Sequence, residues 1–358
     1  MRGERAARLS ELVAAEGLDA LIVEGAANLR YVTGYTGSSG LALVRADGSG
    51  VFYTDFRYQT QSAEEVDEAF SREIVTGELL DTVAAALDGC RIGFDDAAMS
   101  VRSRARLGEL AGVGVELVGA AGLAERLRAV KDEREIAAIA AAATLVDEIY
   151  AWLFAQPLAG RTERELAIAL EHEMCLRGAS APSFDSIVAA GAHGALPHAQ
   201  PRSVPIERGS LVIFDIGARL DGYCSDCTRT VSVGEPGERA REIYGIVLAA
   251  QLAGLEAVAP GVSGREADAR ARAVIEAAGH GEHFGHGLGH GVGLDIHEAP
   301  RLSRTAGEEP LVAKNVVTVE PGIYLPGELG VRIEDLVVVR AGGPQILSAF
   351  TKELLVLE

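Results

Sequence analysis

Two aspartates in one predicted hairpin are the first residues that could do chemistry. Two strands around a turn at Asp221-Gly222 are predicted by the segment LVIFDIGARLDGYCSDCTRTVSV (211–233). With a two- or four-residue turn, Asp215 and Asp226 share one face of the sheet, opposite each other or one diagonal apart. Two carboxylates at such a short distance repel each other unless a cation lies between them. The hairpin therefore predicts a bound metal ion or a carboxyl group with a raised pKa.

The same hairpin contains Cys224 and Cys227, at the C-x-x-C spacing of zinc ribbons and redox enzymes. An odd separation within a strand points the two thiols to opposite faces, so they cannot converge on one zinc ion. The sequence holds no second C-x-x-C to complete a site of four thiolates. We therefore expect the carboxylates to carry the chemistry, with Cys227 packed as a small hydrophobic residue and Cys224 a neighbour of the site.

A glycine-rich segment with four histidines follows, HFGHGLGHGVGLDIHEAPR (283–301). Glycine at every second position from 285 to 293 disfavours a helix. We expect an extended segment with side chains on one face only, those of His286, Leu288, His290 and Val292. The bare face would let another backbone or a ligand approach closely. A lone histidine is more often a satisfied polar residue than a ligand, but four beside the aspartate hairpin favour chemistry.

A second acidic hairpin is predicted by NVVTVEPGIYLPGELGVRIEDLVVV (315–339). With its loop centred on Gly327, Glu320 and Glu334 face each other, as the two aspartates do. The predicted metal ligands are then four carboxylates and one imidazole, namely Asp215, Asp226, His290, Glu320 and Glu334. Such a set favours two divalent ions, Mn²⁺, Co²⁺ or Zn²⁺. Two ions ~3.5–4 Å apart can hold a bridging water and lower its pKa, which suits hydrolysis.

The length of 358 residues suggests two domains. Residues 1–125 predict an α/β domain with strands at 18–23, 40–45 and 50–55, a hairpin at Asp47-Gly48, and a helix at 79–89 that ends at Gly89. Residues 126–358 predict an α+β domain with a faint duplication. Two capping boxes, Thr162 with Glu165 and Ser263 with Glu266, each start a helix that ends at glycine. Two related halves and chance similarity both fit this pattern.

The composition limits partners and location. A net charge of −19 opposes binding to nucleic acid or to an anionic membrane. No apolar stretch approaches the length of a membrane span, and the N-terminal segment lacks the apolar region of a secretory signal. The four cysteines, Cys90, Cys175, Cys224 and Cys227, suggest reduced thiols. We expect a cytoplasmic protein.

The order of these residues resembles the pita-bread metallopeptidases, and most closely their proline-specific branch, the Xaa-Pro dipeptidases (prolidases) and aminopeptidase P. The motifs that carry the resemblance are the two aspartates, H-G-x-G-x-x-x-H, E-P-G-x-Y and R-I-E-D. It implies a pita-bread catalytic domain with pseudo-twofold halves, preceded by a smaller creatinase-type N-terminal domain. Asp226 and Glu334 would bridge two metals, Asp215 would complete one ion, and His290 with Glu320 would complete the other.

The resemblance also implies roles in catalysis and substrate binding. His198 in ALPHAQP and His297 in DIHEAP would hydrogen-bond the scissile carbonyl and its oxyanion, and Glu320 would shuttle a proton. Arg301 matches a position that would hold the carboxylate of a dipeptide. The remaining matches are Tyr324 and Arg332, at substrate or supporting positions, and His286 as a pocket wall. His193 stands where many relatives are expected to carry asparagine.

The activity implied is cleavage between an N-terminal residue and proline by a hydroxide that bridges two divalent metals, with Mn²⁺ foremost. Proline-containing di- or oligopeptides would be the substrates, and a homodimer the assembly. Arg301 favours dipeptides, whereas GYTGSSG and TDFRY in the N-terminal region resemble aminopeptidase P, which leaves substrate length open. Two alternatives are a methionine aminopeptidase, disfavoured by the N-terminal domain and the R-I-E-D motif, and a pita-bread binding protein without peptidase activity.

Overall fold

The computed structural model describes residues 2–87 and 91–358. Gly89, the predicted end of a helix, and Cys90 lie outside the described residues. The chain divides into two compact units, Met1–Arg128 and Ala129–Glu358. The sequence placed this division after residue 125, within the helix that ends the first unit.

The first unit is built on a mixed six-stranded sheet with the strand order β4-β3-β2-β1-β5-β6. The predicted strands correspond to β1–β3, and the predicted Asp47-Gly48 turn joins β2 to β3 in antiparallel register. The strands are β1 Ala20–Val23, β2 Leu41–Arg45, β3 Gly50–Asp55, β4 Phe70–Val75, β5 Arg91–Phe94 and β6 Glu116–Gly119. The helices are α1 Arg2–Ala15, α2 Ala26–Thr33, η1 Phe56–Tyr58, α3 Gln59–Glu65, α4 Leu79–Ala85, α5 Val101–Leu110 and α6 Leu123–Ala129.

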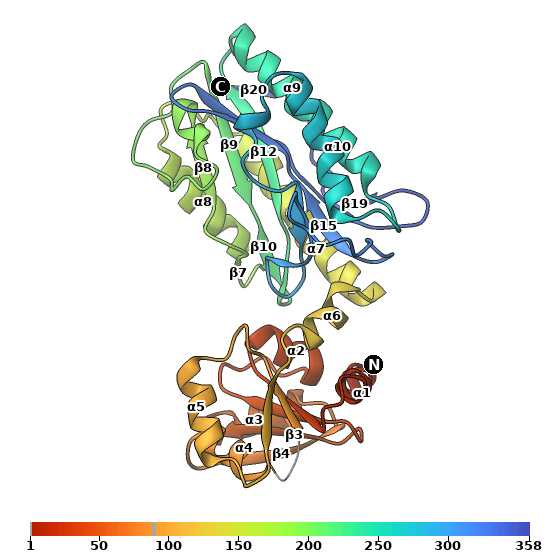
Figure 1. Ribbon diagram of the computed structural model, residues 1–358. Coiled ribbons are helices and arrows are strands. Elements are labelled where there is room, and N and C mark those ends of the chain that lie inside the picture. The colour runs from red at the N-terminus through yellow and green to blue at the C-terminus, as the bar shows by residue number, and fades with distance from the viewer. Residues whose placement is uncertain (1, 88–90) are drawn as a thin grey trace. The chain divides into compact units, whose positions relative to one another are not determined.

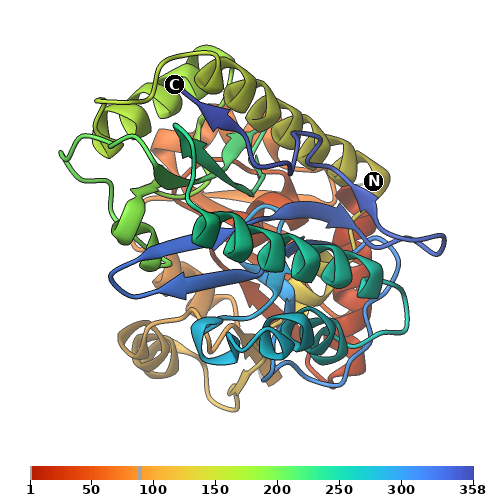
Figure 2. The ribbon, with the colours of Figure 1, turned by 90° about the horizontal axis from the view of Figure 1, so that it is seen from above.

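In the second unit, strands lie between the helix pair α7 and α8 and the helix pair α9 and α10 (Figure 1, Figure 2). The helices are α7 Glu133–Phe154, α8 Glu163–Leu176, η2 Gly191–Ala195, α9 Glu238–Ala257, α10 Gly264–Ala277 and η3 Gly281–His283. The strands up to α9 are β7 Ala181–Pro182, β8 Ile187–Ala190, β9 Ser210–Ile216, β10 Ala218–Leu220, β11 Tyr223–Cys224 and β12 Cys227–Val233. Those after it are β13 Gly289–Gly291, β14 Glu298–Leu302, β15 Val316–Val319, β16 Gly322–Leu325, β17 Leu329–Arg332, β18 Asp335–Val338, β19 Gln345–Ile346 and β20 Val356–Leu357.

The two largest sheets of this unit have four and five strands, and the four-stranded sheet joins distant parts of the chain. The strand orders are β20-β12-β9-β8 and β14-β13-β15-β18-β19. In the first sheet β20 pairs in parallel with β12, so that Val233 lies beside Leu357. The core beneath this sheet includes Phe214, Val231 and Cys227, which confirms the packed role expected for Cys227.

Helix α7 corrects one expectation from the sequence. By length and composition alone this helix could cross a membrane, whereas the sequence predicted no apolar stretch of that length. It starts at a capping box formed by Asp132 and Glu135. Its apolar residues Val146, Ile149 and Leu153 are fully buried in the core of the unit, as in an ordinary core helix.

The faint duplication corresponds to repeated structure. Both predicted capping boxes are present, at the starts of α8 and α10. The two cap residues also make matching isolated bridges, Thr162 with Pro205 and Ser263 with Pro310. Each half then supplies one hairpin whose regular strand structure is interrupted at an acidic residue, at Asp226 in the first half and at Glu320 and Glu334 in the second. These shared features favour two related halves over chance similarity.

The pairing registers bring the acidic residues together as predicted. Asp215 pairs with Thr228, and a two-residue turn at Asp221-Gly222 continues the same register, which places Asp226 one diagonal from Asp215. In the second hairpin Val319 pairs with Asp335 and Gly322 with Arg332. Continuing that register between the two pairs sets Glu320 opposite Glu334, with Gly327 at the centre of the loop.

The glycine-rich segment is extended only in part, and its side chains do not share one face. Among its alternating glycines regular strand is limited to β13, and Leu288 packs into a core cluster with Val317 and Val319. His286 and His290 instead line a cavity. The prediction of close backbone approach is confirmed, since a Cβ on Gly289 would lie 2.0 Å from the carbonyl oxygen of Thr318.

This contact predicts a large effect from a single methyl group. We expect Gly289→Ala to lower the free energy of unfolding by about 1–3 kcal/mol, because the nearest opposing atom is a backbone oxygen, which cannot rotate away. Urea unfolding would measure the loss. Gly285→Ala in the same segment is the matched control, because a Cβ there meets nothing within 4 Å. Equal stability of the two variants would contradict the prediction.

Candidate metal centre

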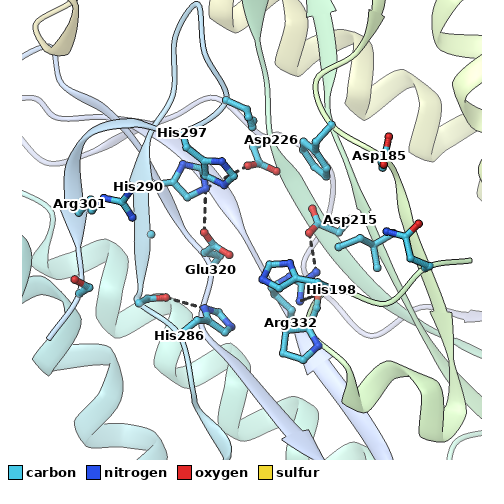
Figure 3. Close-up of a pocket in the computed structure, with 18 residues that line it drawn as sticks. Asp185, His198, Asp215, Asp226, His286, His290, His297, Arg301, Glu320 and Arg332 are labelled. Carbon is cyan, nitrogen blue, oxygen red and sulfur yellow. Dashed lines mark hydrogen bonds and ion pairs between the residues drawn. The ribbon is translucent and has the colours of Figure 1, made fainter. Parts of the chain in front are cut away.

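A cavity of about 450 Å³ in the second unit gathers most of the predicted site residues (Figure 3). Figure 3 shows His290, His297 and Glu320 on one side of it and His198, Asp215 and Arg332 on the other. The predicted residues that line it are His198, Asp215, Asp226, His290, His297, Arg301, Glu320 and Arg332. Glu334 and Tyr324 are buried and are not among the lining residues, but both contact residues that are.

Three carboxylates form a buried cluster at this cavity. Asp215, Asp226 and Glu334 each offer one oxygen, and these oxygens all lie within 4.8 Å of one another. Oδ1 of Asp215 and Oε1 of Glu334 are buried and receive no hydrogen bond from the described residues. Burial first, and then the charges of Glu334 and Asp215, raise the pKa of Asp226 well above its usual value. Buried oxygens without donors and mutual repulsion are what a bound dication would resolve, so the residues fit a metal site.

His290 and Glu320 extend the cluster. Nδ1 of His290 donates to the carbonyl of Gly291 at 3.1 Å, which turns Nε2 toward Glu320 Oε1 at 3.3 Å and Asp226 Oδ2 at 3.6 Å. Burial lowers the pKa of His290 and raises that of Glu320. A neutral imidazole whose second nitrogen is held by a carbonyl is the usual arrangement of a metal-ligating histidine.

Arg332 and Tyr324 support the cluster from behind. Arg332 donates from Nη2 to Asp215 Oδ2 and from Nη1 to the Tyr324 hydroxyl, each at 2.7 Å. Burial raises the pKa of Tyr324 to about 12, so the hydroxyl keeps its proton and donates it to His286 Nε2 at 2.8 Å. His286 Nδ1 donates in turn to the carbonyl of Gly287. Both nitrogens of His286 are thus engaged, as expected of a wall residue rather than a ligand.

Two further histidines and one arginine, at His198, His297 and Arg301, also line the cavity. The ring of His297 lies 4.4 Å from that of His290, centroid to centroid. Burial, and then the neighbouring His290 and Arg301, lower the pKa of His297, which favours its neutral form. His198 comes from the other half of the unit and is exposed at the cavity. Arg301 lies beside His290 in the antiparallel pair of β14 and β13.

The structure argues against a zinc site or a disulfide at the C-x-x-C motif. Cys224 and Cys227 are both free and buried. Their sulfurs face different carbonyls, that of Leu294 for Cys224 and that of Glu334 for Cys227. Neither lines the cavity. The carboxylates of this hairpin therefore carry the candidate chemistry, as the strand parity predicted.

Two threonines that support the ligands escaped the sequence analysis. Thr228 donates from its hydroxyl to Glu334 at 2.8 Å, and Thr318 donates to Glu320 at 3.0 Å. Each lies two positions from an acidic residue, Asp226 or Glu320, so strand alternation could have indicated that they share the acidic face. Phe184, Asp185 and Gln200 also line the cavity, and no pattern in the sequence pointed to them.

Two family descriptions match the chain and together span most of it. Residues 5–130 match the creatinase/prolidase N-terminal domain. Residues 136–341 match metallopeptidase family M24.

Individual relatives match over nearly the full length. An uncharacterized peptidase of Bacillus subtilis, YqhT, is 39% identical over 98% of this chain and 99% of its own. A solved structure of an Xaa-Pro dipeptidase from Bacillus anthracis covers 100% of both chains at 38% identity, with a TM-score of 0.96. An X-Pro aminopeptidase from Thermotoga maritima covers 95% of this chain and 98% of its own at 36% identity, with a TM-score of 0.87.

Proposed function

The chain belongs to metallopeptidase family M24, and from this membership we propose that it hydrolyses the peptide bond between an N-terminal residue and proline. The observation that carries the proposal is the buried group of Asp215, Asp226 and Glu334 beside Nε2 of His290. The activities named for the similar proteins from B. anthracis and T. maritima support it. We assign the chemistry to the domain proposed for residues 126–358, which contains all the cavity residues.

We propose that five residues hold two divalent ions. Asp226 and Glu334 would lie between the ions, Asp215 would complete one, and His290 with Glu320 would complete the other. Four carboxylates suit Mn²⁺ first, with Co²⁺ and Zn²⁺ as alternatives. When bound, the ions polarise the scissile carbonyl and lower the pKa of a water molecule.

The protein's own groups would position the peptide and move the proton. His198 and His297 lie on the two sides of the cavity, where their N–H groups can donate to the carbonyl oxygen as negative charge develops on it. Burial raises the pKa of Glu320, which suits a group that takes up a proton and passes it to the leaving proline nitrogen.

Recognition of proline requires contacts other than those of an extended backbone. An Xaa-Pro bond has no N–H at proline, and the ring fixes φ, so strand-like pairing loses a donor. The exposed guanidinium of Arg301 in the cavity is the candidate partner for the carboxylate of a dipeptide. The length of the preferred peptide is left to experiment.

A three-peptide panel tests the activity. We expect hydrolysis of Ala-Pro or Ala-Pro-Ala with added Mn²⁺, loss of turnover with a chelator, and little cleavage of Met-Ala-Ser. Product formation would be followed by chromatography, with and without each metal. Preferential cleavage of Met-Ala-Ser would favour a methionine aminopeptidase instead. Failure to cleave any peptide, in a protein that retains no metal, would favour a binding protein.

We further propose a cytoplasmic homodimer. The free thiols of Cys175, Cys224 and Cys227 support a reducing location. The net charge of −19 supports peptides rather than nucleic acids or anionic membranes as partners. Analytical ultracentrifugation tests the dimer.

A further inference from the structure

His198 lies on a loop that has little regular structure of its own. Between β8 and β9 the chain forms only the short helix η2 and then turns. The loop residues that line the cavity are Pro197, His198 and Gln200. No hydrogen bond reaches the His198 imidazole from any described residue. The position of this side chain therefore depends on how the loop backbone is held.

Glu163, at the start of α8, ties the two ends of this loop together. Its carboxylate is 1% exposed and accepts the backbone N–H groups of Ala190 at 2.9 Å and Arg202 at 2.8 Å. It also accepts hydrogen bonds from Nδ1 of His193, at 3.0 Å, and from the guanidinium of Arg202. Burial opposes ionisation, but the Arg202 and Ala190 donors still lower the pKa of Glu163 below its usual value. The anchor is thus an ionised carboxylate with its donors supplied by residues 190–202.

The opposite side of the loop rests on the supports of the metal centre. Arg332 donates from Nη1 to the carbonyl of Pro197, next to His198, at 3.3 Å. A Cβ on Gly330 would lie 1.8 Å from the carbonyl oxygen of Gly194, so the loop backbone packs directly on β17. With Arg332 on one side and Glu163 on the other, the loop has a defined place at the cavity.

The second half holds its histidine segment in a similar way. Asp268 of α10 is 1% exposed, pairs with Arg272, and accepts the backbone N–H of Leu288 at 2.9 Å. Arg272 donates to the carbonyl of His286 at 2.7 Å. In both halves a buried carboxylate on the second helix fixes the backbone of a segment that carries a cavity histidine.

We propose that Glu163 is a positioning residue for His198 in the hydrolysis of Xaa-Pro bonds. This inference rests on the proposed function. Glu163 acts through the loop, because it is not among the residues that line the cavity and, within the part of the chain that the structure describes, its carboxylate accepts side-chain and backbone hydrogen bonds from residues 190–202. His193, whose role the sequence left open, is then one of the donors that hold this anchor.

Glu163→Gln keeps the size of the side chain and removes its charge. Each carboxylate oxygen accepts a backbone N–H, and an amide offers an acceptor on one side only, so one N–H must lose its partner. We expect amide hydrogen exchange in residues 190–202 to become ~10-fold faster, with segments around Asp226 and Glu334 unchanged. We expect kcat to fall ~10–100-fold for the preferred Xaa-Pro peptide, since a shift of about 1 Å in a positioned group can have that effect. Metal content should stay at the wild-type value.

A double-variant cycle separates positioning from general damage. If Glu163 acts through His198, Glu163→Gln should lower kcat by less than ~3-fold in a His198→Ala background. Arg202→Ala is the second variant. The Arg202 side chain is 46% exposed, so we expect its removal to weaken the anchor without unfolding the protein. Arg202→Ala should lower kcat by less than Glu163→Gln does, and its effect should likewise be non-additive with that of His198→Ala. Glu173→Gln, on the same helix with an exposed arginine partner, is the matched control.

Three results would overturn the inference: unchanged exchange in residues 190–202, fully additive losses with His198→Ala, or a fall in activity explained by lost metal. The exchange measurement needs no substrate. If the wild-type protein cleaves no Xaa-Pro peptide, the proposed function fails, and the exchange data still decide whether Glu163 anchors the loop.

Discussion

Asp226→Asn is expected to remove bound metal and activity together, with a fall in kcat/KM of at least ~10³-fold. Asp226 is buried beside both Asp215 and Glu334, and one of its oxygens lies 3.6 Å from Nε2 of His290. Asparagine has nearly the same shape but lacks the charge that balances a dication. Metal content by elemental analysis and kcat/KM for the preferred Xaa-Pro peptide would be measured on the same sample.

Asp221→Asn is the matched control for this prediction. It is the same chemical change in the same hairpin, at the turn, where a positive φ of 45° suits asparagine. We expect this variant to keep its metal and its activity. Wild-type turnover by an Asp226→Asn protein free of metal would end the proposed mechanism.

The metal-free protein is expected to lose stability as the pH rises. Burial, followed by neighbouring carboxylates, raises the pKa of Asp226 and of Glu334 well above their usual values. A carboxyl group with a raised pKa in the folded state binds its proton more tightly there than in the unfolded chain. Its stabilising effect is therefore present below about pH 4, the ordinary carboxyl range, and is lost as the pH rises through the raised values.

Asp226→Asn isolates this effect. After chelation, the variant should melt at a higher temperature than the wild type near neutral pH, and the difference should be larger there than at about pH 4. Adding Mn²⁺ should restore the wild type above the variant, because the ions bind only the folded protein. Thermal melting across this pH range checks both statements. A difference that stays constant with pH would show that folding does not raise the pKa of Asp226.

The parts of the site set by strand parity could be predicted from the sequence. The Asp221-Gly222 turn fixes the register of its hairpin, so the sharing of one face by Asp215 and Asp226 followed from counting. The same held for Glu320 and Glu334 around Gly327. The capping boxes that begin α8 and α10 were local signals of the same kind, because each involves side chains three residues apart.

The parts that depend on distant segments could not be predicted. Leu288 turns into the core because Val317 and Val319, on another strand, offer it an apolar surface. The loop around His198 is held by Glu163, which lies 35 residues earlier in the sequence. No local pattern encodes which buried carboxylate will meet which backbone N–H, since that choice is made by tertiary packing.

The parallel pairing of β20 with β12 has a consequence for how the second unit assembles. Val233 and Leu357 are adjacent in the sheet although most of the second half of the unit separates them in the sequence. Contacts between residues so far apart in the sequence make folding slow. A large loop must close, at a cost in conformational entropy, before the strand pairing contributes any stabilising free energy. Until then one side of β12 keeps its N–H and C=O groups open to other chains. A nascent polypeptide is therefore most vulnerable to intermolecular association in the interval between synthesis of these two strands.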